Sequence, residues 1–331
     1  MKWGLVVLLF FVHVVVFASD FENNLSEAMS LLTHNKHKEA EVIFLALEKE
    51  QPDNPDVIYG LAICALSKKE YKKSAELCEK AIEIKKDARY YYILGAANGM
   101  IAQKSNIFKQ IGFIKKIRGA FEESCRLDPK YIEPRMALVQ YYLIAPGIAG
   151  GSIKEALRYA DEIEKIDKLQ GHYARTSIYS HENQYKELLE EYKKITALDP
   201  KSYNPYTGMV NCYIGLKDGQ NAFATIANAE KLFPEQKLLW MYQKGKISAE
   251  CGIDLETGES ALKEYVTKKL NNSLPQPSYA YWRLGMIEEN KKNKDAAIEH
   301  YKTAINLDKN NSYAKKALDK LTKSDEKRSG R

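Results

Sequence analysis

The stretch Pro277–Asn310, PSYAYWRLGMIEENKKNKDAAIEHYKTAINLDKN, contains two amphipathic helical segments joined by a short turn. Large and small apolar residues alternate in it at helical spacing, including Leu284 with Gly285 and Tyr301 with Ala304. Such alternation allows the backbones of two antiparallel helices to approach closely. The stretch therefore predicts a helix-turn-helix unit, and its pattern recurs through most of the chain.

This unit resembles the tetratricopeptide repeat (TPR), which is about 34 residues long and has small residues at fixed positions. The resemblance implies an all-α, TPR-type α-solenoid, a right-handed superhelix of antiparallel helix pairs. We expect residues 19–323 to form about eight such units, followed by an amphipathic helix at 312–322 that caps the last one. Residues 324–331, SDEKRSGR, lack large apolar side chains and are expected to form a disordered tail.

Residues 1–18 differ from the rest of the chain. Lys2 precedes an apolar run, Leu5 to Phe17, that only His13 interrupts, and Ala18 follows it. This pattern predicts a secretory signal peptide that is cut after Ala18, with an uncleaved membrane anchor as the alternative. The sequence therefore predicts an exported protein, periplasmic if the source is a Gram-negative bacterium and secreted otherwise.

Charge and cysteine content exclude some classes of protein. The chain has 50 basic and 44 acidic residues, and they are interleaved on the predicted helices. This balance is typical of a solvated surface and disfavours a nucleic-acid-binding protein. Five scattered cysteines without a CxxC motif predict buried thiols rather than a disulfide scaffold; they are Cys64, Cys78, Cys125, Cys212 and Cys251.

The third unit contains an insertion, IAQKSNIFKQIGFIKKIRG, whose basic part covers residues 104–118. It has five lysine or arginine residues, no acidic residue, and isoleucines at roughly helical spacing. We expect an extended basic amphipathic helix. It either contacts a membrane surface or a partner, or it packs on the solenoid with its lysines in water.

The fourth unit has a long turn, Ala145-Pro-Gly-Ile-Ala-Gly-Gly-Ser152, between its helices. Ser152 and Glu155 form a capping-box pattern that predicts the start of the next helix. Gly-Gly-Ser before a helix can also bind an anion, but no Lys-Ser/Thr pair follows as in a P-loop. Turn and cap are therefore the favoured interpretation.

Two segments, FKQIGFIKKIRGAFEESCRLDP and APGIAGGSIKEAL, together resemble a pattern found in exported bacterial TPR proteins. The shorter PG..GG element is also similar to one in the TPR subunit associated with TRAP transporters. Neither resemblance transfers a binding residue to this chain.

The sequence offers no catalytic or metal-binding motif. His34 and His37 form an HxxH without a third ligand, and His172, His181 and His300 are isolated along the chain. No nucleophile elbow, HExxH or GxGxxG is present. We therefore expect no enzyme, no cofactor and no metal.

The leading interpretation is an exported, non-catalytic TPR scaffold that binds a protein or peptide on its concave face. The alternative is a small-ligand-binding accessory subunit of a transport system, motivated by the PG..GG element and the aromatic residues of the first helices. The sequence does not indicate an oligomeric state.

The resemblance to TPR proteins implies that the first helix of each unit lines the concave face. Applying the family's groove positions predicts these partner-binding residues: Tyr59, Arg89, Tyr92, Tyr173, Ser177, Asn211 and Trp282. Arg89 is expected to pair with a ligand carboxylate, such as a peptide C-terminus. The alternative for each aromatic residue is packing between neighbouring helices.

Overall fold

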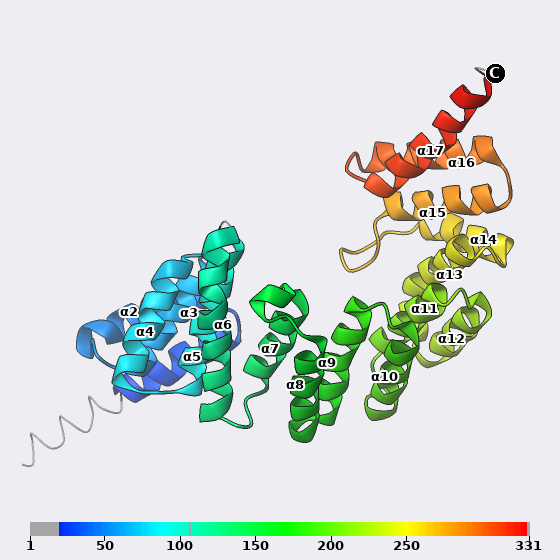
Figure 1. The fold of residues 1–331 in the computed structure, drawn as a ribbon. Helices are drawn as coiled ribbons and strands as arrows, with labels where there is room; N and C mark the ends of the chain where they lie inside the picture. Colours follow the sequence, from blue (N-terminus) through cyan, green and yellow to red (C-terminus); the bar gives the residue numbers. More distant parts are fainter. Residues whose placement is uncertain (1–19, 106, 330–331) are drawn as a thin grey trace, which may run out of the picture. The chain divides into compact units, whose positions relative to one another are not determined.

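The computed structural model describes residues 20–105 and 107–329, and every regular element in these ranges is helical (Figure 1). This confirms the all-α class and the helix-pair architecture. The expected signal peptide, 1–18, lies outside the described residues. None of the described helices is both long enough and apolar enough to span a membrane.

The chain divides into two compact units, one ending at Ala174 and the other beginning at Arg175. The first unit opens with a helix over 20–33. It continues with α2 (His37–Glu50), α3 (Pro55–Ser67), α4 (Tyr71–Ile84), α5 (Ala88–Gln103), α6 (Ile107–Leu127), α7 (Ile132–Ile144), η1 (Gly147–Ala149) and α8 (Ile153–Ile166).

Helix α9 (Lys168–His181) contains the boundary between the two units. The second unit continues with α10 (Tyr185–Leu198), α11 (Asn204–Gly215), α12 (Gly219–Leu232), η2 (Pro234–Gln236), α13 (Lys237–Cys251), α14 (Leu255–Tyr265), α15 (Pro277–Asn290), α16 (Lys294–Leu307) and α17 (Ser312–Ser329). Within this unit the first helices α11, α13 and α15 also contact one another in sequence order.

Small residues on first helices allow close packing within a pair. A Cβ at Gly285 of α15 would lie 2.3 Å from the ring of Tyr301 on α16. A Cβ at Gly245 of α13 would lie 2.1 Å from Leu262 on α14. Both contacts are shorter than any real carbon contact, so these positions require glycine. The alternation of large and small residues read from the sequence is therefore a packing requirement.

The turn inside most pairs contains one residue in the left-handed conformation. Such residues are Asn35, Lys69, Asn183, Lys217, Gly252 and Lys292. A left-handed residue ends the first helix and reverses the chain, at a cost that only glycine avoids. Gly252 follows Gly245 at the same spacing as Lys292 follows Gly285, which places α13 and α15 in the same repeat register.

The inserted segment forms the expected long helix, α6, and Lys104 is the C-cap residue of the preceding helix. The long turn 145–152 is closed by its own backbone. Gly151 N–H donates to the carbonyl of Pro146, and a Cβ at Gly151 would lie 1.8 Å from the Ala145 carbonyl oxygen. The turn thus requires Gly151, which has no room for a Cβ, and Gly150, which has a positive φ of 88°.

Ser152 caps α8 as predicted, since its Oγ accepts a hydrogen bond from the N–H of Glu155 at 3.3 Å. The reciprocal half of the capping box is absent from this site. The Glu155 carboxylate accepts from Arg158 instead, and the N–H of Ser152 donates to the carbonyl of Tyr142.

Helix α17 continues to Ser329, beyond position 323, where the sequence predicted the array to end and a disordered tail to begin. The segment 324–329 contains acidic and basic residues with good helix propensity, and no helix breaker occurs before Gly330. Nothing in the local sequence therefore ends the helix earlier.

The cysteines are free thiols, three of them buried and two half-buried. Burial raises the pKa of Cys64 to about 11 and those of Cys78 and Cys212 to about 12. Thiols with such pKa values carry almost no thiolate at neutral pH and react slowly.

Candidate partner-binding site

Arg89 lies in an ion-paired cluster of the first unit. Its guanidinium donates to Asp87 and to Asp56 at 2.7 Å each, and lies 5.3 Å from the centre of the Tyr59 ring. The hydrogen bond from Arg89 lowers the pKa of the Asp87 carboxyl. A ligand carboxylate at Arg89 would therefore have to compete with two carboxylates of the chain itself.

Two of the predicted tyrosines of the first unit, Tyr59 and Tyr92, contact other aromatic rings. Tyr59 is buried against Tyr90, with ring centres 5.0 Å apart, and burial raises the pKa of its hydroxyl to about 12. Tyr92 lies between Phe121 and Tyr131, at 6.0 and 5.4 Å. Packing between helices thus accounts for much of the surface of both side chains.

Tyr173 and Ser177 are half-buried and lie one turn apart on α9. Residues four positions apart share one side of a helix, as the predicted register requires. Asn211 is exposed on α11, and Trp282 is half-buried on α15, in the second unit.

Asn211 and Trp282 adjoin residues on α13 and α15 that the sequence register did not select. We name this set the α11–α15 face; it consists of Asn211, Gln243, Lys246, Glu250, Trp282 and Arg283. Lys246 Nζ donates to Asn211 Oδ1 at 2.5 Å, which links α13 to α11. Arg283 Nη1 donates to Glu250 Oε1 at 2.7 Å, which links α15 to α13.

Arg283 is the most buried cation of this face, with 7% of its surface exposed. Besides Glu250, it donates to the Tyr242 hydroxyl at 3.1 Å and lies 4.7 Å from the centre of the Trp282 ring. The ion pair and the two rings fix the guanidinium in place. Trp282 in turn stacks on Tyr313 of α17 at 4.8 Å.

Lys246 has an unusual charge balance. Burial and the positive charge of Arg283 lower its pKa to about 8, against the opposing effect of Glu250. Glu250 is already ion-paired with Arg283, so one carboxylate faces two cations. An added anion would stabilise the charged form of Lys246.

Gln243 lies one turn from Lys246 on the same side of α13. The residue is 7% exposed, and its Oε1 has no hydrogen-bond partner among the residues that the structure describes. An unpaired buried acceptor costs free energy until a donor reaches it. The face therefore combines a vacant acceptor, an excess of positive charge and an aromatic edge.

Comparison with known protein families supports this helix-pair arrangement. Two family models, both described as tetratricopeptide repeat, match residues 23–97 and 278–311. The chain carries tetratricopeptide repeats. Comparison with curated protein sequences gave no match.

Solved TPR structures show the same fold. The C-terminal part of a TPR repeat-containing protein from Cytophaga hutchinsonii is 14% identical, with a TM-score of 0.52, and the match covers 89% of this chain and 99% of that one. Yeast Tom70 is 12% identical, with a TM-score of 0.55, over 89% of this chain and 60% of Tom70. A TPR protein from Parabacteroides merdae is 14% identical, with a TM-score of 0.49, over 91% and 98% of the chains.

The sequence missed Lys246 because the repeat that contains α13 was read as interrupted around Cys251 to Gly258, so no groove position was assigned to it. In the structure α14 begins at Leu255, soon after α13 ends at Cys251, and the long connection, 266–276, follows α14 instead. Arg283 lies beside the selected Trp282 on α15, at a position that the groove register does not include. The spacing from Gly245 to Gly252, equal to that from Gly285 to Lys292, was the signal that could have restored the register.

The described residues contain no group of three or more side chains suited to hold a metal ion. The Nδ1 atom of His34 lies 2.8 Å from the carbonyl oxygen of Ser30, at the end of the first helix. This local contact explains one histidine of the HxxH motif without a ligand.

Proposed function

We propose that this protein is an exported, non-catalytic TPR scaffold that binds a protein or peptide segment on the concave, first-helix side of its repeats. The TPR fold itself indicates a protein-binding scaffold. The observation that carries the proposal is the charge imbalance at Lys246, where one carboxylate, Glu250, faces two cations on the first helices α13 and α15. We place the principal contact on the α11–α15 face.

A peptide can supply what this face lacks, which is an anion for Lys246 and an apolar group for the Trp282 and Tyr313 rings. A carboxylate of an extended segment can bind the half-buried Lys246 and offset its excess of positive surroundings. An apolar side chain can pack on Trp282 and Tyr313, whose rings present a large area at low entropy cost. The preferred partner is therefore an acidic segment with at least one large apolar residue.

The other predicted residues have a supporting place in this proposal. Tyr173 and Ser177 on α9, and Tyr59, Arg89 and Tyr92 in the first unit, remain predicted partner contacts. Since Arg89 is bound to Asp56 and Asp87, it contributes only if the partner displaces one of them. We therefore consider the α11–α15 face a stronger candidate for partner binding than the Arg89 cluster.

The transport-accessory alternative rests on the PG..GG element. The turn 145–152 accounts for Gly150 by its positive φ and for Gly151 by the lack of room for a Cβ, so these two glycines give the alternative no support. Membrane-surface contact through the basic insertion 104–118 is a separate proposal, supported by its five cationic residues and its lack of acidic ones.

The test is a peptide array screened with the purified protein, followed by titration of the strongest binder. Lys246→Gln should weaken that binder by roughly tenfold or more, because it removes the cation that lacks a carboxylate of its own on this face. The matched control is Lys244→Gln on the same helix, because Lys244 pairs with Glu230 at 2.7 Å and points to another side of α13. Equal weakening by both variants would show that charge alone, and not this face, governs binding.

Export has its own test. The features of residues 1–18 support cleavage after Ala18, so N-terminal sequencing of the exported protein should begin at Ser19. Recovery of the intact Met1 terminus from the exported fraction would contradict cleavage.

A further inference from the structure

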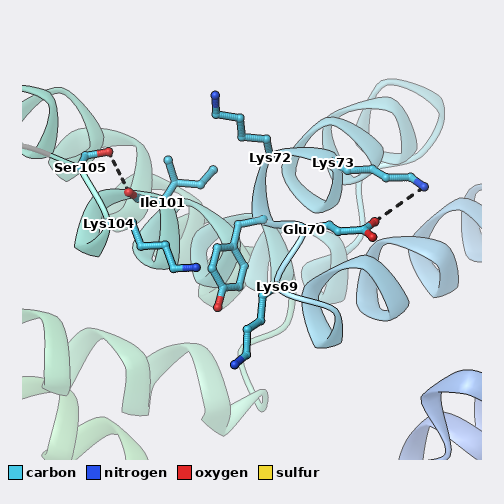
Figure 2. A pocket seen from close by; sticks show the side chains of 8 residues that line it. Lys69, Glu70, Lys72, Lys73, Ile101, Lys104 and Ser105 are labelled. Atoms are coloured by element: carbon cyan, nitrogen blue, oxygen red, sulfur yellow. Dashed lines mark hydrogen bonds and ion pairs between the residues drawn. The ribbon is translucent and has the colours of Figure 1, made fainter.

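Two adjoining hollows of the first unit lie outside the face described above. One, about 600 Å³, opens between the start of α4 and the end of α5 and is shown in Figure 2. The other, about 500 Å³, lies between α3, α5 and α6. Lys69 and Tyr71 line both hollows, so the two hollows adjoin at these residues. We name the two adjoining hollows together the Tyr71 groove.

The first hollow is strongly positive. Lys69, Lys72, Lys73 and Lys104 line it together with one acidic residue, Glu70. Glu70 pairs with Lys73 at 3.9 Å, as the dashed line in Figure 2 shows, and among the described residues the structure pairs none of the other three lysines with a carboxylate. Lys104 lies over the Tyr71 ring at 4.6 Å. Clustered, unneutralised ammonium groups favour an anionic ligand.

The second hollow is apolar. Its large side chains are those of Leu66, Met100 and Phe121. Its α5 side is lined by small residues that project little into the hollow, namely Gly95, Ala96 and Gly99. The lysine cluster borders this apolar part at Lys69. A hydrocarbon chain lying here would therefore carry its anionic end among the ammonium groups.

Gly95 and Gly99 differ in what surrounds them. A Cβ at Gly95 would lie 2.6 Å from the Phe121 ring, so helix packing requires that glycine. A Cβ at Gly99 would meet nothing within 4 Å, as is also true of Gly112 and Gly119 on α6. Unlike those two, Gly99 lines the second hollow, so the absence of its side chain leaves the groove open.

We propose that the Tyr71 groove binds a single-chain anionic amphiphile. Lys69 and Lys104 hold the anionic head, and Leu66, Gly99, Met100 and Phe121 contact the chain. The volumes of the two hollows are those of small-ligand sites, and much smaller than a protein partner needs. This activity is separate from peptide binding in the second unit.

The probes are decanoate, dodecanoate and tetradecanoate, titrated calorimetrically into the purified protein below their micelle-forming concentrations. A fully buried methylene strengthens binding about fourfold, so a half-covered chain should strengthen it about twofold for each added methylene. Undecyl maltoside, which has the same alkyl chain as dodecanoate and no charge, should bind at least tenfold more weakly. Affinity independent of chain length, or equal competition by acetate, would overturn the proposal in favour of a simple anion site.

Paired variants test each half of the groove. Gly99→Leu should fill the apolar part and weaken dodecanoate binding tenfold or more, whereas Gly119→Leu on α6, where a Cβ also meets nothing within 4 Å, should not. Both variants replace a helical glycine with a better helix former, so loss of folding is not expected. Unchanged binding by Gly99→Leu would refute the assignment.

The double variant Lys69→Asn with Lys104→Gln tests the positively charged half of the groove. Asparagine is chosen at position 69 because that residue has a φ of 66°, a left-handed conformation that asparagine tolerates. This double variant should weaken dodecanoate binding at least tenfold. Lys115→Gln with Lys116→Gln removes the same charge from the exposed side of α6 and should change little. Equal loss in both double variants would move the anionic contact to the basic insertion and overturn the groove.

Discussion

Lys246 is the residue of the α11–α15 face whose charge is most sensitive to pH. Its pKa of about 8 in the folded protein is below the ordinary lysine value of about 10.4. Between those two pH values the unfolded chain keeps a proton that the folded chain has lost, so the free protein gains stability as pH rises. The groups that face the amine are Asn211 on α11, Arg283 on α15 and Glu250 on α13.

Binding of an acidic peptide should have the opposite pH dependence. A carboxylate favours protonated Lys246, so above pH 8 binding must take up a proton and its affinity should fall, by up to about tenfold per pH unit. Titrations of one peptide at pH 7, 8 and 9 measure this slope. Lys246→Gln should abolish it; the same slope in that variant would assign the proton to another group.

Gly285 is the residue on which pairing of α15 with α16 depends. Gly285→Ala should destabilise the protein by roughly 1–3 kcal/mol, because the new Cβ overlaps the fully buried Tyr301 ring. Gly119→Ala is the control, since its Cβ meets no atom within 4 Å and better helix propensity should stabilise α6 by about 0.5–1 kcal/mol. Denaturant unfolding of both variants gives the two values; similar signs would contradict the packing assignment.

At the scale of single elements, the stability of helix α8 depends on its N-terminal cap, Ser152. Ser152→Ala should lower the local stability of α8 by about 1 kcal/mol, because the N–H of Glu155 loses its acceptor. Amide hydrogen exchange over residues 153–156 reports this opening directly. Ser152→Asp should restore protection, and peptide binding should stay unchanged in both variants. Lost binding with normal protection would give Ser152 a direct role in recognition.

The helix pairs could be predicted from the sequence because the residues that pack within a pair lie close together along the chain. Leu284, Gly285 and Tyr301 show a large-small alternation that only close antiparallel helices explain, and α15 and α16 pair accordingly. The Arg89 ion pair with Asp56 could not be predicted in this way. Those residues are 33 positions apart, and their contact depends on how one repeat stacks on the next.

The α11–α15 face was only partly predictable for the same reason. Asn211 and Trp282 follow from the register of their own repeats, whereas the turn after α13 hid Lys246. The contact between Arg283 and Glu250 joins neighbouring first helices, again 33 positions apart. The sequence thus located the first helices but not the electrostatic coupling between them.

At the scale of the whole molecule, the two units present different chemistry. The second unit combines the vacant Gln243 acceptor with Lys246, and the first contains the lysine-lined Tyr71 groove. The peptide and amphiphile proposals therefore involve separate residues. Variants of one site should leave the other unaffected, which allows each to be refuted alone.

Photo-crosslinking of the strongest array peptide tests the central claim most directly. Benzoylphenylalanine in place of Trp282 lies on the α11–α15 face, and in place of Leu307, an exposed residue at the end of the second helix α16, it provides the control. A peptide held on the first-helix side should form an adduct at position 282 and none at 307, and Lys246→Gln should abolish it. Adducts at 307 alone, or equally at both positions, would contradict first-helix binding.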